Sequence, residues 1–429
     1  MVIKSTSYNS SLYFKNNKNM LIKSNEKELK MIEQIIENEL VEIYFQPIVS
    51  IRTKKVYAYE ALTRCTYNGQ NLPPDILFNL AKENNLIIEL DEMTRNKAIK
   101  KFHQYYIQNS DLLLFLNVES SLINNIDEFL NKNSFIETIG NLNIPFKNFI
   151  LEIKEDEISN LNSLNKFCDT YKKLGFSIAL DDFGTGSSTF HRINLIRPDL
   201  IKIDKSLFTD VKNNLVNKEI VKAIAKMSHN LGIRVLAEGV EDEDAICLGL
   251  KSTINLFQGY FFSKPQNQIT KMEEEHIVEK IIDIGKLFKN RNIAGINKKR
   301  EVINKYELIS VDMTHKIDDL DKSYEVLKNE FIKHLDIEAI YLIDADSSKQ
   351  VNDTIINENI NEMFKPTKHG DEHYLKEYYY ITLESKQGIF LSQKYISYAT
   401  GNICKTFAKK FILENKIYIL CLDIVIEGG

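Results

Sequence analysis

The sequence lacks the features that mark secreted, membrane-spanning and zinc-binding proteins. Its cysteines are few, odd in number and without a Cys-x-x-Cys pair; they are Cys65, Cys168, Cys247, Cys404 and Cys421. Such a set fits a reducing compartment better than a disulfide framework, and it argues against a structural zinc site. No apolar run approaches the roughly 20 residues of a membrane span, and the polar start lacks the apolar segment of a signal peptide. We therefore expect a soluble, cytoplasmic protein without a membrane span.

Neither sign of charge dominates the chain. Its 429 residues carry a net charge of −5, and acidic and basic residues are mixed throughout. A strongly basic face for duplex nucleic acid is not expected, so we predict no nucleic-acid partner. Hydrophobic residues make up 43% of the chain, which is enough for sizeable cores, and the length suits two domains.

The first part of the chain alternates between strand-like and helix-like patterns. Residues 1–25 form a polar leader, and an α/β domain follows over residues 26–285. Its predicted strands are Val41–Val49, Val56–Tyr59, Leu112–Val118, Phe149–Ile153, Phe176–Leu180, Leu200–Ile203 and Arg234–Ala237. Amphipathic helices such as Leu161–Leu174 and Lys218–Leu231 separate them, which predicts a parallel sheet with crossover helices. With about seven or eight such units, a closed barrel is favoured over an open sheet.

The pattern changes after about residue 285. Residues 286–300 are rich in Lys, Arg and Asn and read as a solvated linker, and residues 301–336 read as a long charged helix. This helix either pairs with itself in a dimer or connects two domains; its apolar positions do not sustain the heptads of a coiled coil. Residues 337–429 form a smaller α/β domain with predicted strands at Ala339–Ile343, Tyr378–Leu383, Ile389–Gln393 and Ile417–Ile424.

Charged and amide side chains recur at the carboxyl ends of the predicted barrel strands. They are Glu60, Asn117, Glu152, Asp181, Asp182, Lys202 and Glu238. The carboxyl ends of barrel strands meet on one face, where such folds build their active sites. A single acid there is about as often a helix cap or an ion-pair partner as a metal ligand, but five successive strands favour a shared site. Oxygen ligands of this kind suit Mg²⁺ or Mn²⁺.

The segment Asp181-Asp182-Phe183-Gly184 adds detail to this metal hypothesis. Two adjacent carboxylates leave a strand, and the glycine allows a tight turn after them. As the backbone turns, Asp181 could bridge two ions while Asp182 serves the second. Two ions a few Å apart are the arrangement that displacement at a phosphodiester requires.

Eight short motifs that include these residues resemble those of the EAL-family cyclic di-GMP phosphodiesterases, in the same order. They are Tyr44–Ile48, Tyr59–Arg64, Phe115–Val118, Leu151–Glu155, Asp181–Gly186, Pro198–Asp204, Ala237–Glu241 and Gln258–Pro265. The resemblance implies a modified TIM (β/α)₈ barrel that hydrolyses cyclic di-GMP to linear pGpG with two Mg²⁺ or Mn²⁺ ions. A barrel, a long helix and a small α/β domain in this order are similar to YkuI-type members. That likeness implies a PAS-like or Cache-like sensory domain, whose small ligand is unknown, and a homodimer.

The resemblance also assigns roles to individual residues. Metal ligands are Glu60, Asn117, Glu152, Asp181 and Asp182; catalytic residues are Glu238 as the proton acceptor and Lys202 beside the attacking water. Substrate-side residues are Gln46, Leu62, Arg64, Gln258 and Glu241, and Glu155 anchors the loop that follows the two aspartates. The planar fork of an arginine such as Arg64 suits a phosphate.

Two positions depart from the family pattern. Ser187 stands where Tyr is usual, and Lys154 stands where Thr is common. Neither change removes a metal ligand, which favours an active enzyme over a catalytically silent cyclic di-GMP receptor. The enzyme and the receptor are each favoured over a plain structural barrel. Both changes touch the loop that the family uses to couple dimerisation to metal affinity, so turnover and regulation are the properties that they put in question.

Overall fold

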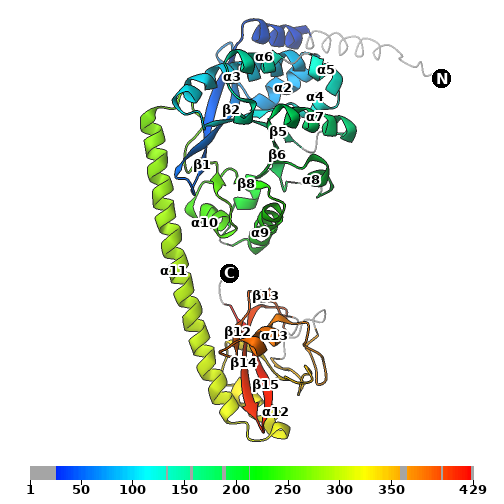
Figure 1. Ribbon diagram of the computed structural model, residues 1–429, viewed down its shortest axis with the longest axis vertical. Helices are drawn as coiled ribbons and strands as arrows, with labels where there is room; N and C mark the ends of the chain where they lie inside the picture. Colours follow the sequence, from blue (N-terminus) through cyan, green and yellow to red (C-terminus); the bar gives the residue numbers. More distant parts are fainter. Residues whose placement is uncertain are drawn as a thin grey trace, which may run out of the picture. The chain divides into compact units, whose positions relative to one another are not determined.

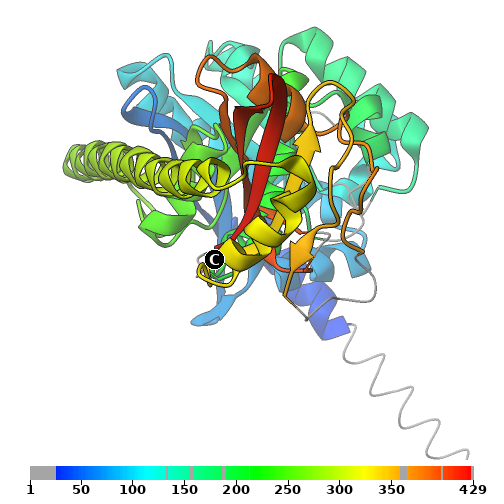
Figure 2. The same ribbon diagram turned by 90° about the horizontal axis from the view of Figure 1, so that it is seen from below.

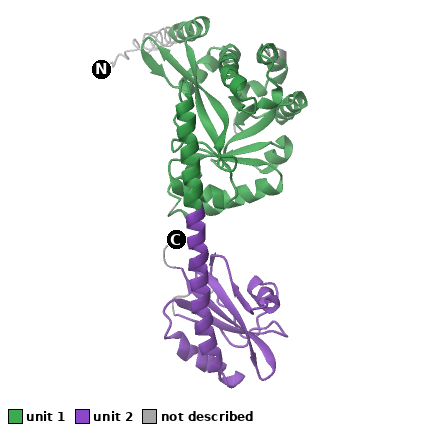
Figure 3. Ribbon diagram, turned by 60° about the vertical axis from the view of Figure 1, so that its left-hand side comes forward, with its two compact units in different colours: residues 1–288 green, residues 289–429 purple. Residues whose placement is uncertain are grey.

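The computed structural model describes residues 26–131, 134–154, 158–185, 190–211, 213–357, 365–397 and 400–426. The chain divides into two compact units, residues 1–288 and 289–429 (Figure 3). Across the described segments, no helix combines the length and the apolar character that crossing a membrane requires.

The first unit is built on a closed barrel of eight strands. In chain order they are β1 (Val41–Ser50), β2 (Lys55–Tyr67), β4 (Leu113–Asn117), β5 (Phe149–Lys154), β6 (Ser177–Phe183), β7 (Leu200–Ile203), β8 (Arg234–Ala237) and β9 (Leu256–Phe257). Neighbours pair in the order β2, β4, β5, β6, β7, β8, β9, β1, and the ladder between β1 and β2 closes the ring. The short strand β3 (Gln70–Leu72) extends β2 as a hairpin. The prediction of a modified TIM barrel is confirmed.

One strand breaks the all-parallel pattern that the alternation of elements predicts. β1 runs antiparallel to both neighbours, β2 and β9, whereas the other neighbours in the ring are parallel. The reason is the short turn at residues 51–54, which leaves no room for the crossover that a parallel pair needs. β2 also continues to Tyr67, so Glu60 lies within a strand and not at its end.

Helices cover the outside of the barrel (Figure 1). They are residues 26–37, α2 (Pro74–Glu83), α3 (Ile87–Gln108), α4 (Ser120–Ile123), α5 (Ile126–Asn131), α6 (Ser134–Asn141), α7 (Leu161–Leu174), α8 (Phe190–Ile196), α9 (Leu215–Asn230) and α10 (Glu243–Lys251). The bounds of α7 match the prediction because both ends carry strong signals. The Asn160 side chain accepts hydrogen bonds from the N–H groups of Asn162 and Ser163, and Gly175 ends the helix at φ 104°.

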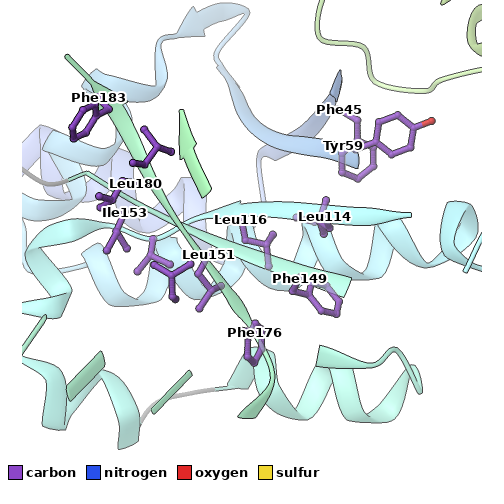
Figure 4. Packing of buried hydrophobic residues seen from close by; sticks show 14 of the residues in the cluster. Phe45, Tyr59, Leu114, Leu116, Phe149, Leu151, Ile153, Phe176, Leu180 and Phe183 are labelled. Atoms are coloured by element: carbon purple, nitrogen blue, oxygen red, sulfur yellow. The ribbon is translucent and has the colours of Figure 1, made fainter. Parts of the chain in front are cut away.

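Side chains of the barrel strands alternate between two apolar layers. Leu114 and Leu116 of β4 and Leu151 and Ile153 of β5 belong to the large core between strands and helices (Figure 4). Phe115 and Ile150, on the opposite faces of the same strands, pack in a smaller cluster inside the barrel. This alternation follows from the two-residue repeat of a strand, and it decides which polar residues enter the barrel.

The second unit is a six-stranded antiparallel sheet with helices on both faces. The sheet order is β11 (Ile355–Ile356), β10 (Ile337–Asp344), β15 (Lys416–Val425), β14 (Ile403–Leu413) and β12 (Ile389–Leu391), and β13 (Tyr395–Ile396) also pairs with β14. One face packs on residues of α11 (Lys271–His315) and on α12 (Ser323–Phe331), which crosses in front of the red strands in Figure 2. The other face packs on α13 (Glu377–Glu384).

Several predicted elements of this region differ from the structure. Residues 286–300 are helical within α11, because the run contains no proline and its many Lys, Arg and Asn residues are compatible with a helix. The predicted helix over 301–336 ends at His315, since the Asp319 side chain caps a new turn by accepting a hydrogen bond from Asp321 N–H. The predicted strand Tyr378–Leu383 is helix α13, and a run of aromatic and β-branched residues does not by itself exclude a short helix.

Candidate active site

All eight barrel strands bring a polar side chain to the same end of the barrel interior. The apolar layer inside the barrel consists of Ile48, Ala58, Phe115, Ile150, Ala179, Leu200, Leu236 and Leu256. Because side chains alternate, the residue two positions nearer the barrel mouth points into the same interior. Those residues are Gln46, Glu60, Asn117, Glu152, Asp181, Lys202, Glu238 and Gln258. Polar residues that are far apart in the sequence therefore form one layer above the apolar one.

Lys202 lies among the acids of this polar layer and is 1% exposed. Its Nζ atom is 2.6 Å from Glu152 Oε1, 2.7 Å from Glu238 Oε1, 3.0 Å from Asp181 Oδ1 and 3.6 Å from Glu60 Oε1. Burial by itself would lower the pKa of Lys202, but attraction by the four carboxylates outweighs burial and raises the pKa well above its usual value. At neutral pH one buried ammonium group therefore faces four carboxyl groups, a set that favours further cations.

The carboxyl groups around Lys202 differ in acidity. Burial raises the pKa of Glu152 and of Glu238 well above the usual value, although Lys202 acts in the opposite direction. Burial also acts to raise the pKa of Asp181, but there Lys202 prevails and lowers it. Asp181 therefore holds its negative charge firmly, whereas both glutamates need additional positive charge to ionise. Neighbouring acids whose pKa values are pushed apart are typical of sites that move protons or bind ions.

Amide side chains complete the polar layer on the side of Glu60. The Gln258 side-chain amide donates to Glu60 Oε2 and lies 3.1 Å from Gln46 Oε1. Asn117 Nδ2 lies 3.4 Å from Glu60 Oε1. These contacts orient the Glu60 carboxylate, and they join four residues that the sequence assigned to metal or substrate binding.

Asp182 belongs to a second group of acids beside Lys202. Carboxylate oxygens of Asp181, Asp182 and Glu238 lie within 4.8 Å of one another, a spacing at which they could hold a metal ion. Asp182 has a positive φ of 52°, which Asp tolerates better than most residues. Gly184, two residues further on, has φ 103°. The backbone thus turns at the two aspartates, as their sequence predicts, and turns both carboxylates toward Glu238.

A cavity of about 600 Å³ opens at this end of the barrel. Its lining includes Glu60, Asn117 and Asp181 of the polar layer and the predicted substrate residues Leu62 and Arg64. The Arg64 guanidinium carbon lies 5.6 Å from the centre of the Tyr44 ring. A larger cavity of about 850 Å³ lies at the other end of the strands and contains none of the polar-layer residues.

One predicted site residue with a described position, Glu241, is not joined to this group. Glu241 is exposed in the segment between β8 and α10 and does not line the 600 Å³ cavity. Glu155 and Ser187 lie outside the described residues. The roles assigned to these residues remain predictions.

Sequence reasoning missed a buried ion pair beside the cavity. Asp91 and Arg95 of α3 are 2% and 3% exposed, form an i,i+4 pair and line the cavity wall. Asp91 Oδ1 lies 3.4 Å from the Glu119 N–H, which ties α3 to the segment after β4. Burial raises the pKa of Asp91 to about 6, against the effect of Arg95. The available signal was two opposite charges at helical spacing between apolar residues.

The fold and the site together define a class: a closed α/β barrel with an acidic, lysine-centred site at one end of its interior. The sequence pattern of the EAL domain matches residues 29–265. The chain therefore belongs to the EAL domain family, which confirms the resemblance inferred from its motifs.

Curated relatives match this part of the chain. The cyclic di-GMP phosphodiesterase PdeA of Borreliella burgdorferi is 28% identical over 251 residues, which are 58% of this chain and 37% of PdeA. The signaling protein YkoW of Bacillus subtilis is 30% identical over 238 residues, which are 55% of this chain and 29% of YkoW. The chain thus spans about a third of the length of these relatives.

Solved structures share the fold. The Bacillus subtilis YkuI protein, solved with an EAL domain in complex with cyclic di-GMP and calcium, has a TM-score of 0.75 and is 20% identical. The match covers 92% of this chain and 99% of that chain. The PaMucR phosphodiesterase in complex with cyclic di-GMP has a TM-score of 0.52 over 56% of this chain and is 21% identical.

Proposed function

We propose that this chain hydrolyses cyclic di-GMP to linear pGpG with Mg²⁺ or Mn²⁺, as part of second-messenger signalling. The observation that carries the proposal is the polar layer at one end of the barrel, in which Lys202 contacts four carboxyl groups beside a 600 Å³ cavity. Family membership and the names of the curated relatives support the same substrate.

The donor set fits divalent ions. The ligands that we assign are Glu60, Asn117, Glu152, Asp181 and Asp182. All are oxygen donors, which Mg²⁺ and Mn²⁺ prefer. Glu152 Oε2 is buried and accepts no hydrogen bond from the part of the chain that the structure describes, so its lone pairs remain available to an ion. Bound ions would supply an acidified water and neutralise charge on the phosphate.

The chain's own residues then have definite tasks. Glu238 accepts the proton of the attacking water; burial raises its pKa, so its carboxyl group needs the positive charge of bound ions to be ionised for this task. Lys202, which holds Glu238 at 2.7 Å, keeps that carboxylate oriented and offers positive charge as negative charge develops on the phosphate. Arg64, on the cavity wall, donates to phosphate oxygens. Gln258 holds Glu60 and is itself hydrogen-bonded to Gln46, and both glutamines border the substrate.

We also propose that the second unit regulates the first and that the chain acts as a homodimer. The second unit has its own two-sided core, as a separate sensory domain requires. Light scattering of the purified full chain tests the dimer, and a mass corresponding to one chain would rule it out.

The test of the activity compares the wild-type chain with two isosteric variants. Glu60→Gln keeps the shape of the side chain but removes its charge, and we expect turnover to fall by more than about a hundredfold, because even residues that only support metal ligands are worth 10–100-fold. Glu219→Gln changes an exposed glutamate of α9 that pairs with Lys222, and it should retain wild-type turnover. The measurement is chromatographic separation of pGpG after incubation with cyclic di-GMP and Mn²⁺.

The alternative is a receptor that binds cyclic di-GMP without hydrolysing it. Calorimetric titration with the nucleotide, run beside the turnover assay, separates the two. Binding without pGpG formation would replace the enzyme by the receptor, and the absence of both would refute the proposal altogether.

A further inference from the structure

Lys154, one of the two departures from the family pattern, makes a contact within the proposed metal site. It is the last residue of β5, two positions beyond Glu152, and its register partner on β6 is Asp181. Its Nζ atom lies 2.7 Å from Asp182 Oδ2. The side chain also lines the 600 Å³ cavity, so a positive charge lies at the mouth of the site, at a position where Thr is common in the family pattern.

Two lysines together reach the three acids that could hold a metal ion. Lys202 contacts Asp181 at 3.0 Å and Glu238 at 2.7 Å from within the barrel, and Lys154 contacts Asp182 from the cavity side. The two lysines differ in exposure. The side chain of Lys202 is 1% exposed, whereas that of Lys154 is 50% exposed and can leave Asp182 without opening the core.

We propose that Lys154 is a displaceable internal counter-ion that competes with a divalent cation for Asp182. This inference rests on the proposed function, because it assumes that Asp181, Asp182 and Glu238 receive an ion. With Lys154 in place, an ion gains less at Asp182, since it must first break the ammonium–carboxylate contact and then tolerate a nearby positive charge. The expected consequence is a site that fills at a higher metal concentration than it would with a neutral residue.

The size and the salt dependence of the effect follow from the exposure of the pair. Lys154 opposes metal binding in two ways: its ion pair with Asp182 must be broken, and its ammonium group then repels the bound ion. Both contributions are small at an exposed site, so removal of Lys154 should tighten metal binding by roughly 3- to 10-fold. Salt screens interactions between exposed charges, with a Debye length of about 10 Å at 0.1 M and about 3 Å at 1 M. The gain should therefore shrink as salt is raised.

The experiment is a calorimetric titration of the full chain with Mn²⁺ at low salt, without nucleotide. Lys154→Thr and Lys154→Met remove the charge, and Lys154→Arg keeps it. Lys166→Thr is the matched control, because Lys166 is 52% exposed and pairs at 2.5 Å with Asp127 outside the site. We expect tighter Mn²⁺ binding in Lys154→Thr and Lys154→Met, and wild-type affinity in the other two.

The outcomes separate this inference from the function on which it rests. Wild-type or weaker affinity in both charge-removing variants overturns the role of Lys154 and leaves the metal site standing. The same gain in Lys166→Thr also overturns it, because the effect would then reflect net charge alone. Failure of the wild type and of every variant to bind Mn²⁺ refutes the metal site itself, and the inference with it.

Discussion

Replacement of Lys202 by Met removes the central charge of the site and keeps most of the volume of the side chain. Lys202 is 1% exposed and lies between 2.6 and 3.6 Å from four carboxyl groups. Removing one partner of a buried ion pair costs about 3–5 kcal/mol, because the other partner is left buried and uncompensated. The pKa of Lys202 is raised, so its contribution to stability is complete below the pKa of an unfolded lysine, and pH 7 lies well inside that window.

Protonation limits this loss and makes it depend on pH. Burial already raises the pKa of Glu152 and Glu238, and loss of Lys202 raises both further. A carboxyl group with a raised folded-state pKa favours folding below its unfolded pKa, and that advantage is lost as pH rises through the folded value. The deficit of Lys202→Met should therefore be largest at pH 7 and shrink toward pH 5.

The assay is urea unfolding in EDTA, followed by circular dichroism because the chain contains no tryptophan. The barrel transition should lose about 3–5 kcal/mol at pH 7, and a separate transition of the second unit should not move. Lys166→Met, which breaks an exposed pair, should cost under about 1 kcal/mol. A Lys202→Met loss no larger than that of Lys166→Met, or a loss that grows toward pH 5, would refute the account of the site as a charged, buried cluster.

Two further predictions concern single residues outside this cluster. Burial lowers the pKa of His373, which is hydrogen-bonded to Tyr378, from 6.5 to about 4. The neutral imidazole therefore stabilises the fold above pH 6.5, and this stabilisation is lost as pH falls toward 4. Urea titrations should show that His373→Gln costs about 2 kcal/mol more at pH 7 than at pH 5, and an equal cost at both pH values would contradict the neutral, buried imidazole. A Cβ atom on Gly259 would lie 2.0 Å from the Val240 carbonyl oxygen, so Gly259→Ala should destabilise the barrel by about 2–4 kcal/mol in thermal unfolding. The control is Gly140→Ala, which has open space around its Cβ and should be neutral or stabilising. Equal effects of the two substitutions would disprove the clash.

The sequence predicted the barrel strands better than the second unit. The strand prediction at Leu200–Ile203 is confirmed to the residue, because buried strands are short apolar runs with abrupt ends. In the second unit the Tyr378–Leu383 run predicted a strand, but α13 forms there because Tyr378 and Tyr379 pack on the second face of the sheet. The antiparallel direction of β1 follows from the short turn between β1 and β2. The alternation of strand-like and helix-like patterns predicted parallel strands and took no account of that turn.

The chemical character of the site was determined by the sequence alone. Acids, amides and one lysine occur two residues beyond apolar strand residues, and the two-residue repeat of a strand is enough to place them on one face. Closure of the barrel decided which of them meet: it brought Lys202 to carboxyl groups of β2, β5 and β6 and of Glu238 just after β8, and it tied Glu60 to Gln258, 198 residues away. Tertiary structure also placed Lys154 on Asp182 and put the Asp91–Arg95 pair in the cavity wall. Such contacts depend on how far each strand advances along the barrel, and the spacing of residues within one strand carries no information about that offset.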